Sequence, residues 1–150
     1  MTVTACDEYL EAAIYVKALL TSPPITINNA DGNPVDLEVD EHPGVELGVY
    51  PRITFSEAAW TDVSVINGVR VWSEVLLLVH AIWRGESTLA LRAAAKAIDA
   101  RLHRSSGLTS EAQILECVRQ GGFTAQDVEG GISYRRLGGY YLLTVQPLDP

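Results

Sequence analysis

The stretch VRVWSEVLLLVHAIW, residues 69–83, decides the fold of this chain. A segment this rich in β-branched and aromatic residues favours an extended strand. One alternating set contains Val75 and Leu77 and the other contains Leu76 and Leu78, so both faces are apolar in the middle. We therefore expect a central strand that is covered on both sides, by helices or by neighbouring subunits.

The residues before this strand indicate its hairpin partner. Asn67-Gly68 is the strongest short signal for a hairpin turn. Residues 49–55, VYPRITF, favour another strand, with Pro51 near its start or at a sheet edge. Between them we expect a loop over residues 56–68 that contains Trp60.

Two segments have the apolar spacing of amphipathic helices. The first is residues 6–20, and the Pro23-Pro24 pair ends it because proline cannot continue a helix. The second follows Ser87, a suitable N-cap, and ends at residues 105–107. The apolar positions are Tyr9, Ala13, Val16 and Leu20 in the first helix, and Leu91, Ala95, Ile98 and Leu102 in the second.

The C-terminal part of the chain predicts strands at residues 112–119 and 132–146. Glycine pairs at 121–122, 130–131 and 138–139 predict bends or bulges, so we expect a loop over 121–131 and a break in the last strand at the third pair. Together the segments predict one α+β domain over residues 1–150. Its sheet is antiparallel or mixed, and two main helices pack on one face.

Charge is distributed unevenly along the chain. The net charge is −8, made up of −9 over residues 1–63 and +1 over residues 64–150. Residues 25–48 are predicted to form an acidic extended arm or hairpin around the turn at residues 31–34. From Asp31 to Glu46 this segment has six carboxylates and no Lys or Arg. We expect it to be exposed and to become ordered only against a partner.

Composition disfavours several classes of protein. A net acidic chain is repelled by phosphate backbones, which argues against a general nucleic-acid binder. The longest apolar run, Val75–Val79, is too short to span a membrane, and the N-terminus lacks the pattern of a secretory signal. We expect a soluble protein that stays where it is made, with Cys6 and Cys117 as reduced thiols.

The sequence predicts no catalytic residue, metal site or cofactor. His42, His80 and His103 have no metal-ligand spacing, and neither cysteine joins them. His80, between apolar neighbours, fits a hydrogen-bonded structural histidine. The alternative is a small dimeric α+β enzyme or ligand-binding domain with a polar pocket at His80 and Glu74.

Arg135-Arg136 lies between Tyr134 and Tyr140 in a basic and aromatic segment. Because neighbouring strand residues face opposite ways, we expect the two arginines to lie on different faces. Arg and aromatic residues are enriched in protein interfaces. On chemistry alone the candidate interface residues are Trp60, Arg135, Arg136 and Tyr140.

The order of these segments is similar to that of a known family. Residues 50–55 (YPRITF) lead through the Asn-Gly turn to residues 80–85 (HAIWRG), then to a helix ending at residues 98–103 (IDARLH), and finally to residues 133–136 (SYRR). Over about residues 6–146 this resembles the small tail-terminator, or tail-completion, proteins of long-tailed bacteriophages and related tail-like particles.

The resemblance implies a non-enzymatic virion protein without cofactors, made in the bacterial host cytoplasm. Such a subunit forms a homo-hexameric ring on the head-proximal end of the tail tube, stops tube growth and meets the head–tail connector. DNA passes through without specific binding, and no membrane is involved. We expect Asp36, Glu38, Asp40 and Glu41 to line the lumen or to face the connector. The alternative within the same particle is another neck protein, a stopper or adaptor.

Overall fold

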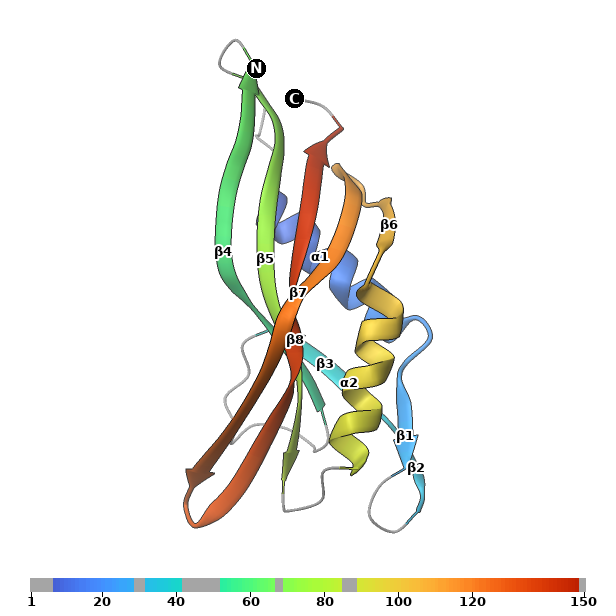
Figure 1. The fold of residues 1–150 in the computed structure, drawn as a ribbon. Helices are drawn as coiled ribbons and strands as arrows, with labels where there is room; N and C mark the ends of the chain where they lie inside the picture. The colour runs from blue at the N-terminus through green and yellow to red at the C-terminus, as the bar shows by residue number, and fades with distance from the viewer. Residues whose placement is uncertain (1–6, 29–31, 42–51, 67–68, 85–88, 149–150) are drawn as a thin grey trace.

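A computed structural model describes residues 7–28, 32–41, 52–66, 69–84 and 89–148 (Figure 1). Its main sheet has six strands in the order β3-β4-β5-β8-β7-β6, and β1 and β2 form a separate two-stranded sheet. β3 is parallel to β4, and the other neighbours in the main sheet are antiparallel. The elements are α1 (Glu8–Thr21), β1 (Thr26–Asn28), β2 (Pro34–Asp36), β3 (Glu38–Glu41), β4 (Arg52–Ile66), β5 (Val69–Arg84), α2 (Leu89–Leu102), β6 (Ser105–Leu108), β7 (Ala112–Glu129) and β8 (Ile132–Pro147).

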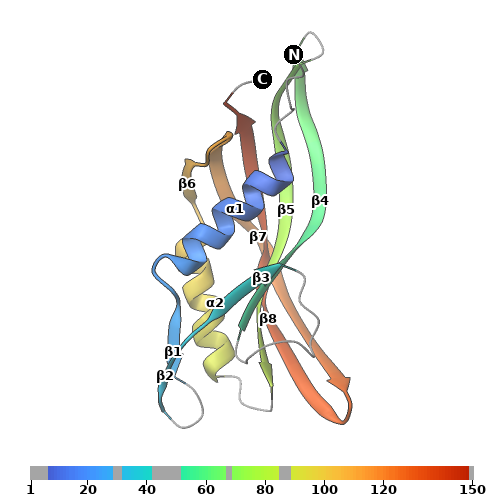
Figure 2. The same cartoon turned by 180° about the vertical axis from the view of Figure 1, so that it is seen from behind.

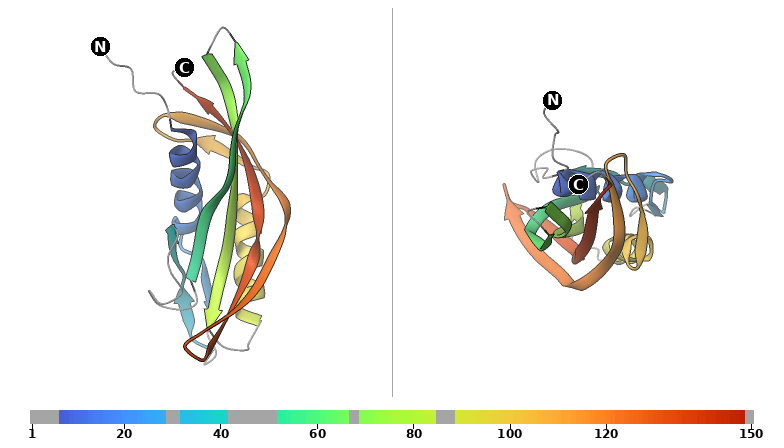
Figure 3. Two further views of the ribbon diagram at one scale, coloured as in Figure 1. Left: turned by 90° about the vertical axis from the view of Figure 1, so that its left-hand side faces the viewer. Right: turned by 90° about the horizontal axis from the view of Figure 1, so that it is seen from above.

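Both helices pack on the same face of the main sheet, which we call the inner face (Figure 2). The long strands twist and curl around this face, as the views in Figure 3 show. Side chains of α1, α2, β5 and β8 form one buried core. It includes Val16, Leu77, Ile98 and Leu143, all with no exposed surface. The predicted α+β class, with a mixed sheet and two helices on one face, is confirmed.

The helix termini follow from local chemistry. Asp7 caps α1, because its Oδ1 accepts a 3.0 Å hydrogen bond from the backbone N–H of Leu10.

The hydroxyl of Tyr15 donates a 2.7 Å hydrogen bond to Ser105 Oγ and so connects α1 to β6. Of the stripe predicted for the second helix, Leu91, Ile98 and Leu102 are buried.

The prediction of a loop over residues 56–68 is wrong for residues 56–66. They continue β4 as one strand, and its partner β5 accompanies it along its whole length, with three irregularities of register. Trp60 lies within this strand, opposite Val75, and its side chain is outside the described part of the chain. The Asn67-Gly68 turn also lies outside the described residues.

Two of the three glycine pairs do not interrupt their strands. β7 continues through residues 121–122, with register shifts nearby, and β8 pairs with β5 without a shift across residues 138–139. At Gly138 a Cβ would lie 2.1 Å from the carbonyl oxygen of Val79, so the backbones approach too closely for any side chain. The expected loop over residues 121–131 is therefore wrong up to Glu129, where β7 ends, and only Gly130 and Gly131, with φ of 58° and 78°, form a turn.

The acidic segment is part of the fold rather than a separate arm. β1 and β2 form the predicted hairpin, but β3 joins the main sheet beside β4. Leu37 and Val39 are buried in the core, at 3% and 5% exposure. The expectation of order only against a partner is therefore wrong for the described residues up to 41, and residues 42–48 lie outside them.

Within the described parts of the chain, neither helix has the length and hydropathy needed to cross a membrane.

Candidate functional site

Two exposed carboxylates lie where β2 leads into β3. Asp36 accepts a 2.5 Å hydrogen bond from the hydroxyl of Thr26 across the small sheet. Glu38, at the first position of β3, is also exposed and has no hydrogen-bond or ion-pair partner among the described residues. We call Asp36 and Glu38 the acidic edge.

The next two carboxylates are used within the chain. Asp40 forms an ion pair with Arg52, which is only 4% exposed. Glu41 accepts a hydrogen bond from the hydroxyl of Tyr9 on α1. Burial, reinforced by this carboxylate, raises the pKa of Tyr9 above its ordinary value. The four carboxylates that the sequence suggests as one acidic surface thus divide into two that are free of cations and two with internal partners.

A cleft of about 410 Å³ opens between the first turns of α2 and the strands β7 and β8. Its charged lining is basic, and we call it the arginine cleft. It is lined by Leu91, Arg92, Thr124, Ala125, Gln126, Arg135, Arg136 and Leu137.

The three arginines of this cleft differ in their partners. Arg136 Nε donates a 2.8 Å hydrogen bond to Asp127 Oδ2. Arg135 is half-buried, and its buried Nε has no hydrogen-bond partner among the described residues. Arg92 is exposed on α2, and no described carboxylate pairs with it. The cleft therefore has an excess of positive charge.

The register of β8 separates the two neighbouring arginines, as the alternation predicted. Arg136 is among the residues that line the arginine cleft, but in the β8 register it belongs to the outer-face set with His80, whose pKa it helps to lower. Arg135 shares the inner face with Leu137, which packs against the core beneath the helices. Arg92 is not among the residues predicted for an interface, because only the chain topology brings α2 beside β8.

The outer face of the sheet, opposite the helices, carries an aromatic cluster. Phe123 lies 5.3 Å from the ring of His80 and 6.0 Å, edge to face, from the ring of Tyr140. His80 is 4% exposed, and its Nε2 lies 3.1 Å from the hydroxyl of Thr54. Burial, with a smaller effect of Arg136, lowers the pKa of His80 to about 4. The lowered pKa leaves the His80 ring uncharged at pH 7, and its buried position beside the Thr54 hydroxyl agrees with the hydrogen-bonded setting expected from its apolar neighbours.

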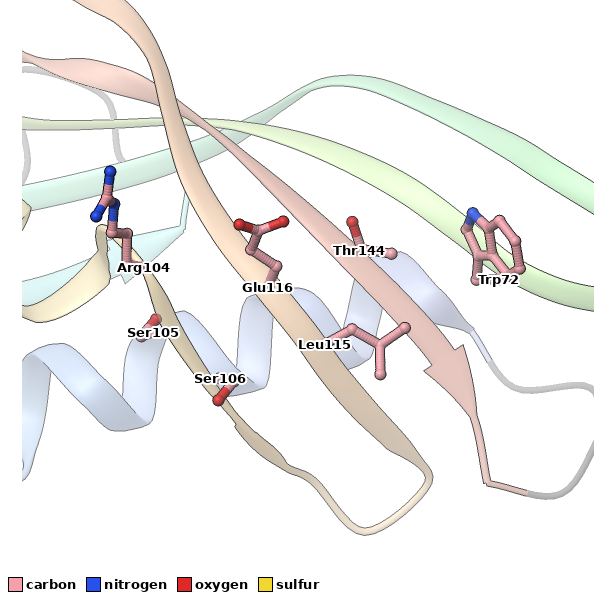
Figure 4. A pocket seen from close by; sticks show the side chains of 7 residues that line it. All are labelled: Trp72, Arg104, Ser105, Ser106, Leu115, Glu116 and Thr144. Atoms are coloured by element: carbon pink, nitrogen blue, oxygen red, sulfur yellow. The ribbon is translucent and has the colours of Figure 1, made fainter.

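A second cavity, of about 740 Å³, extends across neighbouring strands from the start of β6 over β7 and β8 to β5 (Figure 4). It contains two serines but no histidine, and Arg104 and Trp72 lie far apart along it. Its lining residues are Trp72, Arg104, Ser105, Ser106, Leu115, Glu116 and Thr144. Neither this cavity nor the arginine cleft is lined by His80 or Glu74, where the enzyme alternative places its pocket.

Other reactive groups of the described chain do not cluster. Cys117 is buried, and burial raises the pKa of its thiol to about 12. It therefore remains a protonated thiol at pH 7. The described residues contain no group of three or more His, Cys, Asp or Glu side chains arranged to hold a metal ion.

Comparison with known proteins adds no family assignment. No protein-family model matches this chain, and no curated protein sequence matches it. Its functional interpretation depends on the surfaces described above and on the order of its elements.

Proposed function

We propose that this chain is a structural subunit of a phage tail or tail-like particle. As a homo-hexameric ring it caps the head-proximal end of the tail tube, stops tube polymerisation and forms the joint to the head connector. The observation that carries this proposal is the element order α1, β4–β5 hairpin, α2, β7–β8 hairpin, which agrees with the order expected from the resemblance.

The outer face of the sheet supports a role in assembly. Leu76 and Leu78 on β5 pair across the strands with Leu142 and Tyr140 on β8, and all four are half-buried. No described helix covers this face. An apolar sheet face without a covering layer is suited to burial against another protein subunit.

Net charge is consistent with a ring through which DNA passes. At −8 the subunit repels phosphate, so DNA would not adhere to it during passage. The excess positive charge of the arginine cleft is local and is outweighed over the whole chain.

The test is electron microscopy of particles assembled without this protein, with the wild-type gene supplied in trans as the control. Overlong tubes without heads are expected, because only loss of a cap allows polymerisation to continue. Tails of normal length, detached from emptied heads, would instead indicate a stopper or adaptor of the neck. Complete particles would reject both roles and would favour the enzyme alternative.

A second test uses the outer face directly. Leu78→Lys places a charge in the apolar surface and should prevent capping of tubes polymerised from purified tail-tube protein. Ser110→Lys, at an exposed position outside this surface, is the control for the added charge. Tube lengths that Leu78→Lys still limits as well as wild type would argue against the outer face as an assembly surface.

A further inference from the structure

We propose that the arginine cleft of one copy binds the acidic edge of a second copy, so that subunits join head to tail. This inference rests on the ring in the proposed function and names the contact that would close it. Its two halves are Arg92 and Arg135 on one copy and Asp36 and Glu38 on the next.

The cleft has cationic groups that lack counter-charges among the residues that the structure describes. Asp127 pairs with Arg136 at 2.8 Å, which leaves Arg92 and Arg135 without a carboxylate among the described residues. The Nε of Arg135 is buried and has no acceptor among the described residues, so no described group offsets the charge of this guanidinium. Guanidinium groups bind carboxylates with charge-assisted hydrogen bonds, which are the strong class.

The acidic edge supplies the complementary groups. Glu38 is exposed and has no cation beside it, whereas its neighbours Asp40 and Glu41 are already paired with Arg52 and Tyr9. Asp36, two residues earlier, accepts only the hydroxyl of Thr26 and so keeps its full negative charge available. For these two carboxylates, a contact with a neighbouring subunit replaces the expected position in the lumen.

β2, which ends at Asp36, and β8, which contains Arg135, lie on opposite flanks of α2, and no described ion pair joins the acidic edge to the arginine cleft within one chain. In Figures 1 and 2, β1 and β2 lie on one flank of α2, and β7 and β8 lie on the other. A contact between two different surfaces of identical copies is heterologous, and repeated heterologous contacts close into a ring when the rotation permits. This placement is therefore compatible with a cyclic assembly, whereas a rotation that does not close would give an open filament.

Charge complementarity of this kind determines register and partner choice more than affinity. Exposed ion pairs contribute little by themselves, and salt weakens them. The affinity must come from apolar surface buried beside the charges, and the charge pairs select which surfaces meet. Assembly should accordingly weaken, without unfolding, as the salt concentration rises.

The test is reversal of charge on each half, with native mass spectrometry and light scattering of the full chain as the readouts. Arg92→Glu and Glu38→Lys each change one exposed residue and leave the core intact. Each variant alone should assemble about tenfold or more weakly than wild type. Lys96→Glu on α2 and Glu111→Lys are the matched controls with the same changes in charge, and both should assemble normally.

Mixing the two variants gives the decisive result. Each interface in the mixture then joins either the native pair of surfaces or the doubly reversed pair, so alternating rings should form at wild-type concentration. Arg135→Glu mixed with Asp36→Lys repeats the test with the second pair of residues. Failure of both mixtures to assemble, or normal assembly of the single variants, would overturn the inference.

These outcomes separate this inference from the proposed function. An assembled wild type that is insensitive to all reversals would reject the contact and leave the tail role standing. A ring that the reversals dissolve but that does not cap tail tubes would support the contact and reject the tail role. A wild-type chain that stays monomeric at every concentration would reject the contact and the ring.

Discussion

The hydroxyl of Tyr141 on β8 donates a 3.0 Å hydrogen bond to Asp99 Oδ1 on α2. Tyr141 is 1% exposed and belongs to the main core, so this bond connects the central sheet to the helix across a buried layer. Burial and the neighbouring carboxylate raise the pKa of Tyr141, which keeps the phenol protonated and able to donate.

Tyr141→Phe should lower the free energy of unfolding by about 1 kcal/mol, the usual net value of one hydrogen bond. Urea denaturation followed by circular dichroism measures this loss. Tyr140→Phe is the matched control, because the side chain of Tyr140 lies on the outer face and has no hydrogen bond among the described residues. Equal effects of the two changes would contradict the structural role of the bond.

Gly138→Ala should destabilise the protein by about 3 kcal/mol or more, or prevent folding. The added Cβ would lie 2.1 Å from the Val79 carbonyl oxygen and 2.5 Å from His80 Cα, and backbone atoms cannot move aside cheaply. Gly121→Ala, where no atom lies within 4 Å of the added Cβ, should change stability by about 1 kcal/mol or less. Soluble yield and thermal denaturation of both variants provide the comparison.

His80 should make stability depend on pH in a defined window. Its pKa is about 4 in the native protein and 6.5 ordinarily, so between these values the unfolded chain binds a proton that the native protein excludes. The free energy of unfolding should therefore fall as pH drops from 6.5 to 4, by about 3 kcal/mol from this residue. Denaturation of wild type and His80→Gln across this range measures the difference. Identical pH profiles, or an NMR titration of His80 near pH 6.5, would contradict the prediction.

Asp40→Asn should reduce stability by about 2 kcal/mol. The change removes a carboxylate partner of the buried Arg52, and its cost is below that of a fully buried pair because Asp40 is 43% exposed. Glu38→Gln removes the same charge two residues earlier on the same strand, where no partner is lost, and should change stability by less than about 0.5 kcal/mol. A Glu38→Gln loss as large as that of Asp40→Asn would show that the Arg52 pair is not the cause.

The apolar periodicity of the sequence was sufficient to predict α1, α2 and β5, because each has a long and consistent apolar pattern. It was insufficient for β4, where Glu57, Ala58 and Ala59 have weak strand propensity and are exposed. These residues are extended because β5 offers hydrogen-bonding partners along its whole length, a tertiary effect that overrides local preference. The loop expected over residues 121–131 and the break expected at residues 138–139 failed for a similar reason, since only cross-strand neighbours distinguish Gly138 from the turn residues Gly130 and Gly131.

The candidate surfaces were predictable only in part. Arg135, Arg136 and Tyr140 stood out by residue type, and the division of the arginines between two faces followed from strand alternation. Arg92 could not be identified from the sequence, because its place in the cleft depends on how α2 crosses the sheet. The acidic residues could also be identified from the sequence. Which of them has an ion-pair partner could not, because Arg52 is brought close to Asp40 only by the parallel pairing of β3 with β4.

The strand order has a consequence for how the chain folds. β4–β5 and β7–β8 pair neighbours in sequence, whereas the β5–β8 pairing joins Arg84 to Tyr134, 50 positions away, and Ser73 to Val145, 72 positions away. Closing such long loops costs more entropy than closing a hairpin, and non-local contacts slow folding. We expect the two hairpins to form first and the seam between β5 and β8 to close last. Pairing of β5 with β8 would then limit the rate at which new subunits become available for assembly.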